Sequence, residues 1–82
     1  MKLYGYSDRN VPTEEIVPDS LAEITLVASP AELRRIAEFL VEGAATMQRM
    51  GASYSHEHLS DWDDSFESSP HFVIAPADPR QV

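Results

Sequence analysis

The segment from Ser55 to Asp61 holds the side chains best placed for chemistry in this 82-residue chain. It reads Ser-His-Glu-His-Leu-Ser-Asp, and a β-strand here would place His56 and His58 on one face. Two imidazoles at that spacing can bind one metal ion, with Asp61 or Asp63 supplying an oxygen ligand. They can equally contact a partner protein, or lie on a strand face without any ligand.

A third imidazole, His71, would suit a zinc site, and the absence of cysteine limits any metal centre to histidine and carboxylate. Nothing in the linear sequence shows that His71 lies beside the other two. An enzyme is the second possibility, with Glu57 or Asp61 as the base in a metal-assisted hydrolysis. A domain this small offers little concave space, and its glycines are not clustered into a phosphate-binding loop. We therefore predict no catalytic residues, no metal and no cofactor.

The next segment, from Asp61 to Glu67, combines carboxylates with two aromatic rings. Tryptophan is a frequent anchor of protein interfaces, and carboxylates around it can pair with Lys or Arg on a partner. Alternatively, Trp62 and Phe66 fold back and close one end of the core, or one ring does each. We expect the following residues at a partner contact: His56, His58, Asp61, Trp62, Asp63, Asp64, Phe66 and Glu67.

The composition is strongly acidic, because 14 Asp and Glu residues against 6 Lys and Arg residues give a formal net charge of -8. The imbalance is greatest between Arg49 and Arg80, where there are several carboxylates and no Lys or Arg. Such a surface repels nucleic acid and anionic lipid headgroups, and it attracts a basic protein. The alternative is that the acidity only keeps a small domain soluble.

The elements that must position these residues follow from the hydrophobic pattern. Ser29-Pro30-Ala31-Glu32 is typical of a helix start, with a serine cap, a proline in the first turn and a glutamate that completes a capping box. Gly51 is the expected helix end. An apolar stripe recurs between them at steps of three and four residues: Leu33, Ile36, Ala37, Leu40, Ala44 and Met47. Strands are expected over Lys2 to Tyr6, Leu21 to Ala28, Ser53 to Leu59 and His71 to Ala75.

The resulting β-β-α-β-β order predicts a two-layer α+β fold, in which one long helix crosses a four-stranded, mainly antiparallel sheet. The uncovered sheet face would be free for a partner or for a second copy of the chain, giving a homodimer. We expect one domain over residues 1–82, with an acidic loop from Asp8 to Ser20 and an extended tail at 77–82. The polar start and the lack of a long apolar run make the cytoplasm the expected location.

Ala28 to Arg34, Ile36-Ala37, Phe39-Leu40 and the run from His56 to Asp61 together resemble the immunity protein 32 family. The helix start recurs wherever helices need caps, so the His-x-His-Leu-x-Asp run is the more distinctive part. Members are proposed antidotes encoded beside polymorphic bacterial toxins. The resemblance therefore implies a cytoplasmic bacterial protein that binds and neutralises a cognate toxin, without catalysis. It does not identify the toxin, and a self-associating adaptor remains a third possibility.

Overall fold

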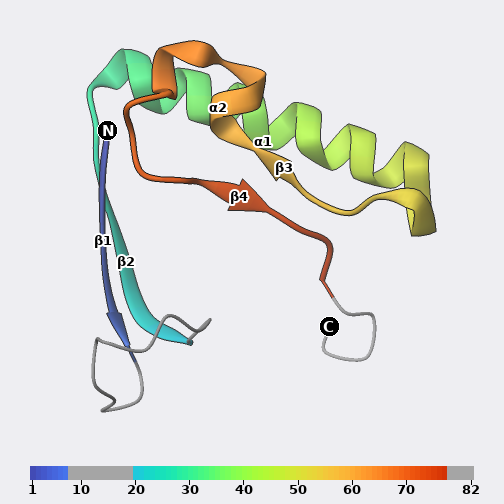
Figure 1. The fold of residues 1–82 in the computed structure, drawn as a ribbon, viewed down its shortest axis with the longest axis horizontal. Helices are drawn as coiled ribbons and strands as arrows, with labels where there is room; N and C mark the ends of the chain where they lie inside the picture. The colour runs from blue at the N-terminus through green and yellow to red at the C-terminus, as the bar shows by residue number, and fades with distance from the viewer. Residues whose placement is uncertain (8–19, 78–82) are drawn as a thin grey trace.

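The computed structural model describes residues 1–7 and 20–77, so the tail at 78–82 and residues 8–19 of the expected acidic loop lie outside the described residues. Figure 1 shows the strand pair β1–β2 extending away from the N-terminal end of helix α1, while the other elements lie along the helix. The elements, in chain order, are β1 (Lys2–Ser7), β2 (Leu21–Val27), α1 (Pro30–Met50), the 3₁₀ turn η1 (Gly51–Ser53), β3 (Glu57–His58), α2 (Leu59–Trp62), the 3₁₀ turn η2 (Asp64–Phe66) and β4 (Val73–Ile74).

Helix α1 begins and ends where the sequence predicts. The Ser29 hydroxyl accepts a hydrogen bond from the Glu32 amide at 3.1 Å, and the Glu32 carboxylate accepts one from the Ser29 amide at 2.8 Å. Gly51 follows the last helical residue with a φ of 56°, a left-handed conformation that glycine adopts without steric cost. Within the described residues, no helix combines the length and the apolar composition that a membrane span needs.

The prediction of one four-stranded sheet is wrong. In the described residues β1 pairs only with β2 and β3 only with β4, both antiparallel, so there are two separate two-stranded sheets. The reason lies in the segment expected as the third strand, where η1 takes up Gly51–Ser53 and α2 begins at Leu59. Residues 54–56 between these turns have no regular secondary structure, so only Glu57 and His58 pair with β4. The open face of a four-stranded sheet, through which we expected a homodimer, therefore does not exist.

The core lies between α1 and the segment formed by α2 and η2. Phe39 and Leu59 are the most deeply buried large side chains, at 0% and 1% exposed, and Ile36 and Phe66 complete the buried cluster. The Phe39 ring lies 5.6 Å from that of Trp62, centroid to centroid. The rest of the cluster's partners, each partly buried, are Met1, Phe72 and Ile74.

The buried face of the helix shares Ile36 with the predicted apolar stripe but is rotated away from the rest of it. Leu33 and Leu40 are 46% and 43% exposed, whereas Phe39, which the stripe omits, is completely buried. The buried line runs from Ile36 through Phe39 to Gly43, again at steps of three and four residues. Gly43 marks a close approach, because a Cβ atom there would overlap Cδ1 of Ile74 in β4.

Candidate functional site

A surface cavity of about 370 Å³ opens beside β3 and α2. We call it the β3–α2 cavity. It brings together several of the residues that the sequence predicts at a partner contact, and it adds Glu57, which the prediction of the contact omits. Its lining residues are His56, Glu57, His58, Asp61 and Trp62.

The single helical turn of α2 gives this cavity its shape. His58 has extended backbone, and Leu59 then begins the turn and places its own side chain in the core. The Leu59 amide donates to the Phe72 carbonyl at 2.9 Å, and the Asp63 amide donates to the Leu59 carbonyl at 2.9 Å. The first bond ties the turn to the chain before β4 and the second closes the turn, so that the buried Leu59 holds the neighbouring polar side chains at the surface.

The three imidazoles form a row. The ring centroids of His56 and His58 are 5.2 Å apart and those of His58 and His71 are 5.8 Å apart, both in edge-to-face arrangements. The Ser55 hydroxyl lies 2.8 Å from Nδ1 of His56. Over residues 1–7 and 20–77, no group of three or more His, Asp or Glu side chains is arranged to hold a metal ion. The structure thus places His71 beside the pair, but in ring contact rather than around a shared ligand.

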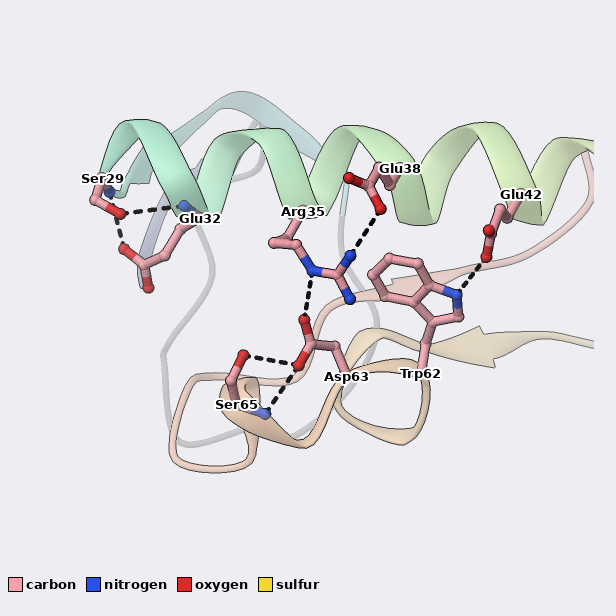
Figure 2. A network of polar contacts seen from close by, with 8 residues as sticks. All are labelled: Ser29, Glu32, Arg35, Glu38, Glu42, Trp62, Asp63 and Ser65. Carbon is pink, nitrogen blue, oxygen red and sulfur yellow. Dashed lines mark hydrogen bonds and ion pairs between the residues drawn. The ribbon is translucent and has the colours of Figure 1, made fainter.

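Trp62 is half-buried and is held by α1 on two sides, as Figure 2 shows. Its indole Nε1 donates to a carboxylate oxygen of Glu42 at 2.6 Å, and Cζ of Arg35 lies 4.6 Å from the ring centroid. The ring also packs against Phe39. A guanidinium at this distance from an indole makes a cation–π contact. Trp62 therefore belongs to the wall of the cavity and to the edge of the core at once.

Asp63 is engaged within the fold. Its carboxylate accepts from Nε of Arg35 at 2.9 Å, and from the amide and hydroxyl of Ser65 at 3.0 and 2.8 Å (Figure 2). The Ser65 hydroxyl and then the Arg35 guanidinium hold the pKa of Asp63 below its usual range. Arg35 also pairs with Glu38 on the same helix at 2.7 Å. Its bond to Asp63, the residue that caps η2, joins α1 to η2.

The other predicted contact residues divide by burial. Phe66 is 3% exposed and lies in the core, while Asp64 and Glu67 are exposed. Of the two rings whose position the sequence leaves open, one is buried and the other, that of Trp62, is partly at the surface. With Asp61, the exposed carboxylates recur every three residues along the segment.

Two buried polar atoms next to the cavity wall have no hydrogen-bond partner among the described residues: Oε1 of Glu57 and the hydroxyl of Tyr54. Burial raises the pKa of the Tyr54 phenol, and the neighbouring Glu57 carboxylate raises it further. The Tyr54 hydroxyl is thus a neutral donor beside the Glu57 carboxylate, and no Lys or Arg of the described residues pairs with that carboxylate.

The sequence prediction of the contact leaves out the helix residues Arg35 and Glu42, because they fall outside the apolar stripe. A signal for them exists in the spacing of Arg35, Glu38 and Glu42, which share one line along α1 at steps of three and four residues. That line faces Trp62 and Asp63.

A comparison with protein families gives one finding: the family model described as Immunity protein 32 matches residues 23–75. The matched range includes α1, β3, α2, η2 and β4, and with them every residue that lines the β3–α2 cavity. No curated protein and no solved structure matches the chain.

Proposed function

This chain belongs to the immunity protein 32 family, and from that membership we propose that it binds a cognate bacterial toxin domain and blocks its activity. In this proposal it acts in the cytoplasm by occupying a basic toxin surface, without catalysis or a cofactor. Nucleic acid and membranes are not its partners, because the net charge of -8 repels both.

The observation that carries the proposal is that three exposed carboxylates, which we call the acidic rim, lie on the same short segment as Trp62 in the wall of the β3–α2 cavity: Asp61, Asp64 and Glu67. Trp62 is fixed by α1 and partly exposed, which suits an interface anchor. The ion pair of Asp63 with Arg35 and the burial of Phe66 in the core hold the segment that carries Trp62 against α1. The side chains left for direct contact are His56, His58, Asp61, Trp62, Asp64 and Glu67. Complementary charge at such a rim speeds association and rejects acidic competitors.

The test uses the toxin domain encoded directly beside the gene for this chain. We expect the purified proteins to form a complex by isothermal titration calorimetry, and we expect co-expression to restore growth of cells that make the toxin. A toxin domain that neither binds this chain nor is blocked by it would refute the proposal.

Charge-neutralising variants locate the surface. Asp64→Asn and Glu67→Gln should each weaken the complex about 1.4- to 5-fold, since exposed ion pairs contribute about 0.2 to 1 kcal/mol. Glu23→Gln is the matched control, because it removes one negative charge from an exposed position on β2. A Glu23 variant that binds as weakly as the other two would mean that overall charge, and not this rim, governs binding.

A further inference from the structure

We propose that the β3–α2 cavity receives the guanidinium of an arginine side chain on the toxin domain. This inference rests on the proposed function and names the chemistry of its contact. The cavity, at about 370 Å³, has room for the end of one long side chain.

The lining has the chemistry of a cation site. Glu57 and Asp61 supply two carboxylates, and no Lys or Arg is among the five lining residues. In the part of the chain that the structure describes, neither carboxylate takes part in an ion pair. Trp62 adds an indole, and a neutral imidazole at His56 or His58 adds one acceptor nitrogen.

The second observation is that the Glu57 carboxylate has no cationic partner among the described residues. Its buried oxygen Oε1 lies beside the hydroxyl of Tyr54, a side chain only 7% exposed, and that hydroxyl is a neutral donor that leaves the negative charge uncompensated. A cation that donates to Glu57 would neutralise this carboxylate, which has no cationic partner among the described residues. Removing that deficit on binding favours the complex over the free protein.

The fold already contains the arrangement that the cavity would reproduce. Arg35 lies over the Trp62 ring at 4.6 Å while it donates to Asp63 at 2.9 Å and to Glu38 at 2.7 Å. Guanidinium stacks on an indole and donates in the plane of its fork to carboxylates at the same time, whereas an ammonium is a compact, strongly hydrated charge. The lining of Glu57, Asp61 and Trp62 offers these same partners to a second arginine. This favours arginine over lysine, and among the described residues no three His, Asp or Glu side chains are arranged around a common point as a metal ion would need.

The first experiment needs no toxin. Nα-acetyl-arginine amide is titrated into the protein and followed by NMR at the Trp62 indole N–H and the imidazoles of His56 and His58. We expect saturable shifts at these groups, weaker shifts with the lysine analogue, and none with the citrulline analogue, which has the same shape without charge. Equal shifts with citrulline or lysine, or no shifts with arginine, would overturn the assignment.

Variants identify the carboxylates. Glu57→Gln should weaken arginine-amide binding about 10-fold, as expected for a partly buried charged hydrogen bond, and exposed Asp61→Asn about 2- to 5-fold. Glu23→Gln, which removes one negative charge from an exposed position on β2 outside the cavity, should leave it unchanged. Asp61 carries the test if the Glu57 variant does not fold, and an Asp61 variant that binds like wild type would contradict the cavity assignment.

The toxin domain separates this inference from the proposed function. If the toxin binds wild type, Glu57→Gln and Asp61→Asn equally well, the arginine assignment fails and the antidote role stands. If arginine amide binds in the cavity but the toxin does not bind the protein, the antidote role fails and the cavity remains an arginine site.

Discussion

The most direct test of the fold compares two adjacent helix residues, Phe39 and Leu40. Phe39 is 0% exposed and packs against the rings of Trp62 and Phe72, so Phe39→Ala leaves a cavity in the core. Such truncations cost about 3 to 5 kcal/mol of unfolding free energy. Leu40 is 43% exposed. Truncating it removes three carbons at about 0.8 kcal/mol each when fully buried, and with roughly half of that burial present Leu40→Ala should cost about 1 kcal/mol.

Urea and thermal unfolding, followed by far-ultraviolet circular dichroism, measure both variants. For a domain of this size about 1 kcal/mol corresponds to 4–8 °C in Tm. We therefore expect a loss of about 4–8 °C for Leu40→Ala and of at least about 12 °C for Phe39→Ala. The reasoning is refuted if Leu40→Ala is the more damaging change, because the apolar stripe read from the sequence, and not the line through Phe39, would then face the core.

Three further predictions follow from particular contacts. Ser29→Ala should lower the unfolding free energy by about 1 kcal/mol through loss of the capping box, and a thermal melt unchanged from wild type would contradict this. Gly43→Ala should not bring the gain of about 1 kcal/mol that this change gives on an exposed helix face, because the new Cβ overlaps Ile74; a Tm raised by 4 °C or more would be evidence against that contact. The folded-state pKa of Asp63 lies below its unfolded value of about 3.9, so its stabilising effect is present above that pH and is lost as the pH falls through the folded pKa. Asp63→Asn should therefore lower the urea midpoint at pH 6, and the difference from wild type should shrink as the pH is lowered below about 3.9; a difference that stays constant with pH would exclude the ion pair as the cause.

The local signals in the sequence were sufficient for α1. Its start depends on the side chains of Ser29 and Glu32 and its end on Gly51, and these act within one turn of the backbone. The two N-terminal strands, which the structure has at Lys2–Ser7 and Leu21–Val27, also follow from their own residues. The helix and both strands could therefore be predicted without knowledge of the residues they pack against.

The sheet and the buried helix face could not be predicted in this way, because they depend on distant residues. Whether Phe39 or Leu40 is buried is decided by where Leu59 and Phe66 pack, and these residues lie far from both along the chain. The alternation from Ser53 to Leu59 resembles a strand, yet its ends form helical turns that fill the space beside α1. Tertiary packing overrides a local preference of this kind.

The candidate site also combines residues that the local sequence indicates with residues that only tertiary packing brings together. His56, His58 and Trp62 could be singled out from residue types and spacing alone, and the structure places all three at one cavity. The spacing of Arg35 and Glu42 with Glu38 places them on one line of α1, but only the packing of α1 against α2 brings that line to Trp62.

The segment after β3 alternates between side chains that hold it and side chains that face outward. Leu59, Trp62 and Phe66 pack toward α1, while the intervening Asp61 and Asp64 are exposed, as is Glu67 beyond them. Under the proposed function, substitutions can change the exposed carboxylates one at a time while the side chains that pack toward α1 stay fixed. The protein can thus change its toxin specificity as the toxin diverges, and each intermediate variant keeps its fold.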